Sequence, residues 1–206
     1  MMEIVLATTN NGKIKEISEI LSEFPVTLSC LSNYDTIPEI IENGDTFLDN
    51  ALIKANTVFN VLKKPCLADD SGLVIPIING EPGVKSARYG CVNDEKPNPN
   101  ILIQRVLTKM KNIQKESRSA YFKAVIVLII NENLKFIAEA ECHGEITFIP
   151  KGNHGFGYDP IFYLPEYHKT MAEITTNEKN KISHRAKALL DLKKQLKTYM
   201  DQQKIT

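Results

Sequence analysis

Two β-rich stretches in the middle of the chain lie only three residues apart. They span residues 120–130 and 134–141, and the residues between them, Asn131-Glu132-Asn133, are typical of a hairpin turn. A tight hairpin joins antiparallel strands, so any sheet built around this pair cannot be purely parallel. The hairpin is therefore the feature that most restricts the fold.

Helical and extended segments surround this hairpin on both sides. Apolar residues recur at helical spacing after Lys13 and in the segments 46–63 and 181–200, and a further helix is expected to end near Lys111. Shorter strands are expected at residues 4–7, 26–30, 66–68, 73–78 and 145–149. This mixture predicts an α/β or α+β domain with a mixed sheet.

The overall charge and composition exclude several kinds of protein. The 206 residues include 25 Lys+Arg and 25 Asp+Glu, whereas a protein that coats nucleic acid or an anionic membrane usually has a clear basic excess. With 43% hydrophobic and 24% charged residues, the chain has the composition of one globular domain. The apolar run 124–130 is too short to span a bilayer, and no signal-like segment opens the sequence. We therefore expect a soluble, cytoplasmic protein.

The cysteines and histidines do not form a metal-binding pattern. The four cysteines lack a C-x-x-C pair, and the four histidines lack H-x-H or H-x-x-x-H spacing. Reduced cysteines in a cytosolic protein are the simplest interpretation. A metal, if one is used, should have carboxylate ligands, which suits Mg²⁺.

The first candidate site follows the first predicted strand. Thr8, Asn10 and Lys13 lie where a strand leads through a polar loop into a helix, an arrangement that can direct donors and a cation at phosphate oxygens. Thr and Asn are also common N-caps, and for this loop taken alone a plain helix cap is the favoured interpretation. The Walker pattern G-x-x-x-x-G-K-[ST] is absent from the sequence, which argues against a P-loop enzyme.

The second candidate site is Asp69-Asp70-Ser71-Gly72. Two carboxylates at a strand end, before a glycine turn, could hold Mg²⁺ and orient a water molecule. An ordinary acidic turn is the alternative, because these residue types favour turns. Glu42, Asp45 and Asp49 supply further carboxylates, although Asp45 or Thr46 could instead cap the helix that follows.

Two more candidates lie toward the end of the chain. Phe156 stands between Gly155 and Gly157, where it could stack on a nucleobase, or it could simply anchor the loop in the core together with Tyr158. Lys179 and the sequence Ser183-His184-Arg185 form a cationic cluster near the last helix. That cluster could bind an anion, or it could be a solvated charged face.

Taken in order, these segments resemble a known family. The motifs are T-x-N-x-x-K (8–13), F-x-x-N-A-x-x-K-A (47–55), A-D-D-S-G-L (68–73), G-x-P-G-x-x-S-A-R-Y (80–89), G-F-G-Y-D-P-I-F (155–162) and I-S-H-R-x-x-A-L (182–189). Together they resemble the inosine/xanthosine triphosphate pyrophosphatase family, over residues 3–197. The resemblance implies an α/β fold with a long, twisted mixed β-sheet flanked by helices, and two lobes with a central substrate cleft. It also implies a single domain over residues 1–206 and a homodimer.

The resemblance further implies an activity and a role for each candidate residue. The expected reaction is Mg²⁺-dependent hydrolysis of ITP, dITP and XTP to the monophosphate and pyrophosphate. Asp70 is expected to be the catalytic base and, with Glu42, a metal ligand, with Asp69 beside it. The implied substrate-binding residues are Thr8, Asn10 and Lys13 for the triphosphate, Ser71, then Phe156, Gly157, Tyr158 and Asp159 around the purine, and Lys179, His184 and Arg185 for the phosphates and the base edge.

Two departures and two alternatives remain at this stage. Asp49 stands where many relatives carry Glu, which leaves its role open, and residues 93–100 match no pattern. A pyrophosphatase for a different modified nucleotide is one alternative. The other is a nucleotide-binding protein without catalysis, which the adjacent Asp69 and Asp70 argue against.

Overall fold

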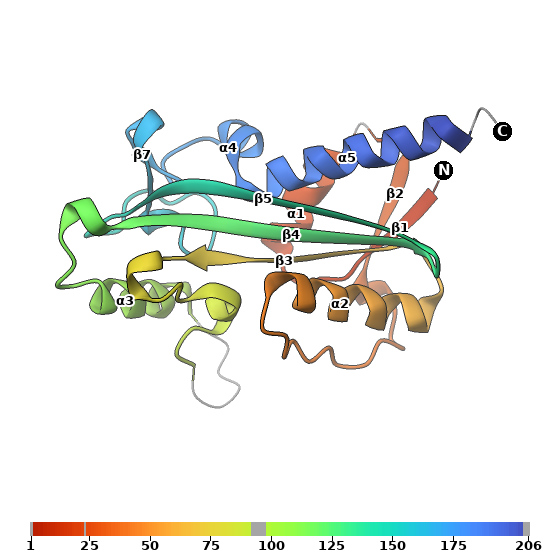
Figure 1. Cartoon of the computed structure of the whole chain (residues 1–206), viewed down its shortest axis with the longest axis horizontal. Helices are drawn as coiled ribbons and strands as arrows, with labels where there is room; N and C mark the ends of the chain where they lie inside the picture. The colour runs from red at the N-terminus through yellow and green to blue at the C-terminus, as the bar shows by residue number, and fades with distance from the viewer. Residues whose placement is uncertain (1, 23, 92–97, 204–206) are drawn as a thin grey trace. The chain divides into compact units, whose positions relative to one another are not determined.

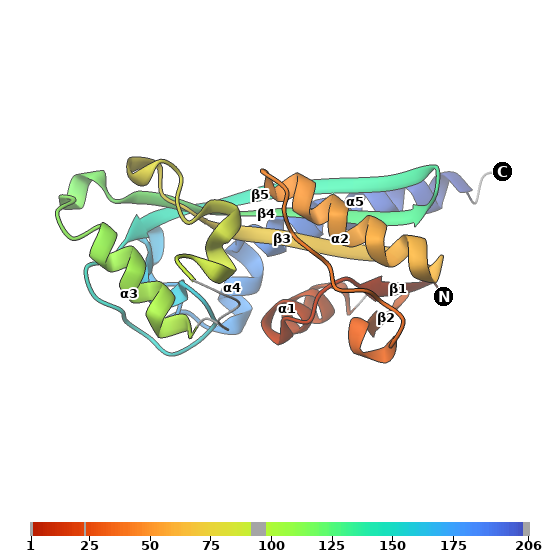
Figure 2. The same cartoon turned by 90° about the horizontal axis from the view of Figure 1, so that it is seen from below.

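The computed structural model describes residues 2–22, 24–91 and 98–203. Within these residues the chain forms one open seven-stranded sheet and five α-helices (Figures 1 and 2). The strands are β1 (Met2–Leu6), β2 (Val26–Cys30), β3 (Cys66–Val74), β4 (Ser119–Asn131), β5 (Leu134–Ile146), β6 (Phe162–Leu164) and β7 (Lys169–Thr170). The helices are α1 (Asn11–Leu21), α2 (Phe47–Leu62), α3 (Pro99–Lys109), α4 (Thr176–Ile182) and α5 (His184–Gln203).

The sheet is mixed, as the hairpin requires. Its strand order is β2-β1-β3-β4-β5-β6-β7. Strand β1 pairs in parallel with β2 and β3, whereas β6 pairs antiparallel with β5 and β7. The prediction of an α/β fold with a mixed sheet is confirmed. Among the described helices, none combines the length and the apolar character needed to cross a bilayer.

The chain divides into two compact units. Unit 1 comprises Met1–Asp70, Ala124–Ala140 and His184–Thr206, and unit 2 comprises Ser71–Lys123 and Glu141–Ser183. Strands β3, β4 and β5 contribute residues to both units.

In unit 1, helices cover both faces of the sheet. Helices α1 and α5 lie together on one face, and α2 lies on the other (Figures 1 and 2). Alternate residues of β1, such as Ile4 and Leu6, point into the core under α1 and α5 because successive side chains of a strand face opposite sides. That core also contains Ile17, Leu21, Leu67, Ala124, Ile126, Leu128, Ala138, Ala188, Leu189, Leu192 and Leu196.

Helix α2 has clear signals at both ends. Thr46 caps its N-terminus in a capping box with Asp49, and Lys63 ends it in the left-handed region at φ 51°. The prediction of a helix over residues 46–63 is confirmed. The carboxylate of Asp49 accepts hydrogen bonds from the backbone N–H and the hydroxyl of Thr46, which gives this residue a capping role.

Unit 2 has its own apolar core. It is formed by the end of β3, α3, parts of β4 and β5 and the segment 158–174; its buried residues include Leu73, Ile75, Leu102, Val106, Met110, Phe122, Ile146, Ile161, Phe162 and Met171. Residues 93–97 of the unmatched segment lie outside the described residues.

The expected turn at residues 69–72 is wrong. Strand β3 continues without a break from Cys66 to Val74 and so includes the start of the strand expected at 73–78. A 3₁₀ helix, Pro76–Ile78, takes the place of the rest of that expected strand. Burial of Asp69 and Asp70 in a strand is possible because cationic side chains pair with both carboxylates. Gly72 is required by close packing, since a Cβ there would lie 2.3 Å from the Ser86 hydroxyl oxygen.

Two other expected boundaries are also wrong. Residues 145–146 belong to the end of β5, and 147–149 are not a strand. The last helix begins at His184 rather than at 181, because Ser183 is extended (ψ 153°) and separates α4 from α5. The remaining expected helices and strands are confirmed within a few residues of their ends.

Candidate active site

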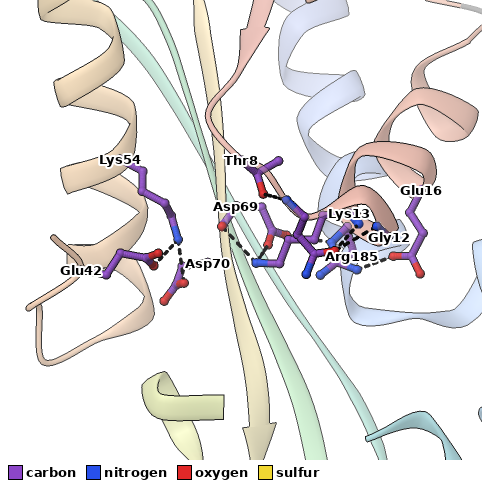
Figure 3. A network of polar contacts seen from close by, with 10 residues as sticks. Thr8, Gly12, Lys13, Glu16, Glu42, Lys54, Asp69, Asp70 and Arg185 are labelled. Carbon is purple, nitrogen blue, oxygen red and sulfur yellow. Dashed lines mark hydrogen bonds and ion pairs between the residues drawn. The ribbon is translucent and has the colours of Figure 1, made fainter. Parts of the chain in front are cut away.

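The two adjacent aspartates of β3 point to opposite faces of the strand. In Figure 3, Asp69 lies toward α1 and α5, whereas Asp70 lies toward α2. Both residues belong to unit 1, as do all the partners described for them below. The alternation of the strand therefore gives two neighbouring carboxylates entirely different surroundings.

The Asp69 carboxylate holds two cations. The ammonium of Lys13 lies 2.5 Å from Asp69 Oδ1, and the Nε–H of Arg185 donates to Asp69 Oδ2 at 2.9 Å. A second guanidinium nitrogen of Arg185 donates to the carboxylate of Glu16, which lies one turn beyond Lys13 on α1. Asp69 and Arg185 are each 1% exposed. Two positive and two negative groups thus form a neutral buried cluster.

The charges in this cluster stabilise one another. Burial alone would raise the pKa of Asp69, but Arg185 and Lys13 hold it well below its ordinary value. Burial likewise opposes the charge on Arg185, yet Asp69 and Glu16 raise its pKa. Both groups therefore remain ionised over the whole physiological pH range.

The Asp70 carboxylate shares a lysine with Glu42. The ammonium of Lys54 on α2 lies 2.8 Å from Asp70 Oδ1 and 2.5 Å from Glu42 Oε2 (Figure 3). Burial raises the pKa of Asp70 to about 6, and the negative charge of Glu42 adds to that effect while Lys54 and Lys13 oppose it. A carboxylate with a raised pKa is a suitable proton acceptor near neutral pH.

Two features of Asp70 and Glu42 fit a magnesium ion. The second oxygen of Asp70, Oδ2, is buried and has no hydrogen-bond partner among the described residues. Carboxylate oxygens are the ligands that Mg²⁺ prefers, and protein sites commonly supply one or two of them, with water and phosphate completing the shell. Across the described residues no group of three or more His, Cys, Asp and Glu suits a metal. Glu42 and Asp70 are therefore the residues that could hold Mg²⁺.

Residues 8–13 are arranged mainly by helix capping. The Asn10 side-chain oxygen accepts from the backbone N–H groups of Gly12 and Lys13, and the Thr8 hydroxyl accepts from the Asn10 N–H. The structural role that the sequence left open for Asn10 is thus present.

Two more predicted residues, Ser71 and His184, are neighbours in sequence of Asp70 and Arg185. Ser71 follows Asp70 in β3 and is half-buried, whereas His184 begins α5 and is 6% exposed. His184 precedes Arg185, so the start of α5 supplies both side chains.

In unit 2, a single carboxylate organises the predicted purine-binding loop. Asp159 Oδ2 accepts from the backbone N–H of Phe156 at 2.8 Å and from the ammonium of Lys179 at 2.6 Å. The same ammonium lies 4.7 Å from the centre of the Phe156 ring, within cation–π range. The Tyr158 hydroxyl donates to the carbonyl of Ser86 and anchors the loop in the core. Phe156 is half-buried, so its ring is held in place while part of it remains accessible.

The two glycines that flank Phe156 provide a matched pair of test variants. Both have positive φ, 77° at Gly155 and 62° at Gly157, so Ala at either position should cost ~1–2 kcal/mol of left-handed strain. A Cβ at Gly155 would lie 2.0 Å from Asp159 Oδ2, whereas one at Gly157 would meet nothing within 4 Å. We expect Gly155→Ala to lower the free energy of urea unfolding more than Gly157→Ala. Equal losses would contradict the proposed role of Asp159 in shaping the loop.

Sequence reasoning missed two residues of the charged centre. Lys54 lies in the F-x-x-N-A-x-x-K-A motif but received no role, although its place on the apolar face of α2 marked it as a buried cation. Glu16 follows Lys13 by three residues on α1, a spacing that places both side chains on one face. Its partner, Arg185, is too distant in sequence to be found from the pattern.

Comparisons with known proteins agree with this description. The model of the Ham1 family matches residues 4–195. The dITP/XTP pyrophosphatase of Geobacillus kaustophilus is 43% identical over 95% of this chain and 94% of its own length. The dITP/XTP pyrophosphatase of Legionella pneumophila (strain Lens) is 46% identical over 94% of this chain and 97% of its own length.

Solved structures show the same likeness. A HAM1 protein from Coxiella burnetii superposes with a TM-score of 0.87 at 42% identity, covering 96% of this chain and 100% of that chain. The Staphylococcus aureus Ham1 protein superposes with a TM-score of 0.84 at 36% identity, covering 96% of this chain and 99% of that chain. This is a mixed α/β protein with a buried centre of carboxylates and cations. The chain belongs to the Ham1 family, which confirms the resemblance seen in its motifs.

Proposed function

We propose that the protein hydrolyses non-canonical purine nucleoside triphosphates, namely ITP, dITP and XTP, to the monophosphate and pyrophosphate. This removes deaminated purines from the nucleotide pool. The printed names of relatives that match nearly the whole chain support it. The observation that carries it is Asp70, a buried carboxylate with a raised pKa, one unpaired oxygen within the described residues and a lysine beside it.

The residues of unit 1 have the chemistry that this reaction needs. Asp70 accepts a proton from the attacking water, whose oxygen forms a bond to the α-phosphorus. The bond from that phosphorus to the oxygen bridging the α- and β-phosphoryl groups breaks, and pyrophosphate leaves. The leaving group gains negative charge, which Lys13 and Lys54 stabilise electrostatically. Glu42 and Asp70 would hold Mg²⁺, which when bound neutralises charge on the phosphates. Thr8 and Asn10, together with Ser71 at the start of unit 2, contribute polar contacts to the substrate.

Recognition of the base falls to the remaining predicted residues. Phe156 stacks on the purine, and Gly157, Tyr158 and Asp159 shape the loop around it. Lys179 supports this loop through Asp159 and the Phe156 ring rather than lying free in solvent. His184 and Arg185 supply donors for the base edge, with the Arg185 guanidinium held in place by Asp69 and Glu16.

Base selectivity follows from donor and acceptor chemistry. Hypoxanthine and xanthine carry a 6-keto oxygen that accepts hydrogen bonds, whereas the 6-amino group of adenine would place a donor against a donor. A site that leaves its buried donors unpaired rejects such an analogue strongly. We further propose that the protein acts in the cytoplasm and as a homodimer.

A panel of triphosphates tests the substrate assignment. Pyrophosphate release should be fastest from dITP, ITP and XTP and slower from dATP and dTTP by ~10² or more, because dATP lacks the 6-keto oxygen and dTTP lacks the purine ring. Faster turnover of dATP or dTTP than of dITP would favour a pyrophosphatase for another modified nucleotide.

A further inference from the structure

The proposed function leaves one buried polar side chain of α2 without a role. Asn50 is 0% exposed, and its Oδ1 accepts the backbone N–H of Gly44 at 2.8 Å. Its Nδ2 is buried and has no hydrogen-bond partner among the described residues. The orientation of the amide is fixed by Gly44, because turning it over would bring an N–H group against another N–H group.

An unsatisfied buried donor argues that the amide is not present for packing alone. Leaving such a group without a partner costs about 1–3 kcal/mol, which an apolar side chain of similar size would avoid. Phe47, three residues earlier on the same face of the helix, is buried and apolar. The bond to Gly44 is thus the specific contribution of an asparagine at this position.

The same bond holds the segment that carries Glu42. Residues 50 and 54 are one helical turn apart, so they lie on one face of α2. Lys54 contacts the side chain of Glu42, and Asn50 contacts the backbone of Gly44 two residues later. Helix α2 therefore fixes this short segment at two points.

Gly44 has no room for a side chain beside Asn50. A Cβ at position 44 would lie 2.5 Å from Asp49 Cβ and 2.9 Å from Asn50 Oδ1. The backbone of the segment consequently packs directly against the first turn of α2, at a distance that only glycine allows.

We infer that Asn50 is a positioning residue for the metal site, which it serves by holding the backbone at Gly44 so that the Glu42 carboxylate stays beside Asp70. The inference rests on the proposed function, because that function makes Glu42 a ligand of Mg²⁺. Residues that orient metal ligands typically contribute 10–100-fold to metal affinity.

Two variants break the contact from opposite sides. Asn50→Leu removes the acceptor, and Gly44→Ala displaces the segment while leaving the buried helix residue intact, which keeps the test valid if Asn50→Leu folds poorly. Asn50→Asp retains an acceptor for the Gly44 N–H and serves as the conservative variant. Asn43→Ala, at an exposed position of the same segment, is the matched control.

The measurements are hydrogen exchange of the Gly44 amide and the binding of Mg²⁺ alone by calorimetry. In Asn50→Leu we expect exchange at Gly44 to accelerate by ~10-fold or more as its bond of ~1.5 kcal/mol is lost. We expect Mg²⁺ affinity in Asn50→Leu and Gly44→Ala to fall by ~10–100-fold. Asn50→Asp should keep Gly44 protected, and Asn43→Ala should match the wild type.

The possible outcomes distinguish a failure of this inference from a failure of the proposed function. Faster exchange at Gly44 with unchanged Mg²⁺ affinity would overturn the positioning role and leave the proposed function standing. Wild-type protein that binds no Mg²⁺ would instead refute the metal role of Glu42, and the inference with it.

Discussion

Replacing Asp70 by Asn is expected to slow pyrophosphate release from dITP by ~10² or more, with nucleotide binding retained. The amide can still accept the hydrogen bond that Lys54 donates to Oδ1 at 2.8 Å, so the packing of β3 against α2 should survive. What it loses is the ability to take a proton from water, together with one carboxylate ligand for Mg²⁺. The measurements are turnover under saturating dITP and the dissociation constant of a non-hydrolysable analogue.

Asp45→Asn is the matched control for this variant. Asp45 is exposed and lies in the same segment as Glu42, so the same chemical change there should leave turnover near the wild-type value. Unchanged turnover in Asp70→Asn would remove Asp70 from the role of base. Another group would then have to take the proton from water.

Replacing Arg185 by Met is expected to destabilise unit 1 by ~3–5 kcal/mol. The guanidinium is 1% exposed and bonds to both Asp69 and Glu16, so its removal leaves buried negative charge without compensation. The measurement is the free energy of unfolding in urea. Loss of less than about 1 kcal/mol would mean that the cluster contributes little to the fold.

An exposed ion pair supplies the comparison. On α1 the ammonium nitrogen of Lys15 lies 3.9 Å from Glu19 Oε1, and the Lys15 side chain is 70% exposed. Lys15→Met should change the unfolding free energy by no more than ~0.5 kcal/mol, because water screens such pairs.

The buried cluster should also make the stability of the folded protein decrease in acid. The pKa of Asp69 in the folded protein is lower than the ordinary aspartate value of ~4. A group of this kind contributes stability above its unfolded pKa and loses it as the pH falls toward the folded value. The free energy of unfolding is therefore expected to decrease below pH ~4.

The secondary structure follows from local patterns except where distant charges intervene. Apolar spacing and capping residues located α1, α2, β2 and the central hairpin, because these signals lie within each segment. Asp69-Asp70-Ser71-Gly72 has the composition of a turn, yet it continues a buried strand. The reason is tertiary: the cations at Lys13, Lys54 and Arg185 come from three separate helices, and no local pattern reports their proximity.

The candidate site, too, could be predicted only in part from the sequence. The motifs singled out Asp69 and Asp70, and the family resemblance added Glu42. The structure gathers all three with Lys13 and Arg185 in unit 1. Phe156, Asp159 and Lys179 likewise come together in unit 2. Glu16 escaped notice because a glutamate on a helix is usually a solvated charge. Lys54 was missed although its place on the apolar face of α2 indicated burial.

The most direct test of the proposed function is the identity of the first product released from dITP. Purified protein with Mg²⁺ should yield dIMP and pyrophosphate in equal amounts, with no orthophosphate before pyrophosphate accumulates. Orthophosphate and dIDP as the first products would mean attack at the γ-phosphoryl group. That result would contradict the account given for Asp70 and its neighbours.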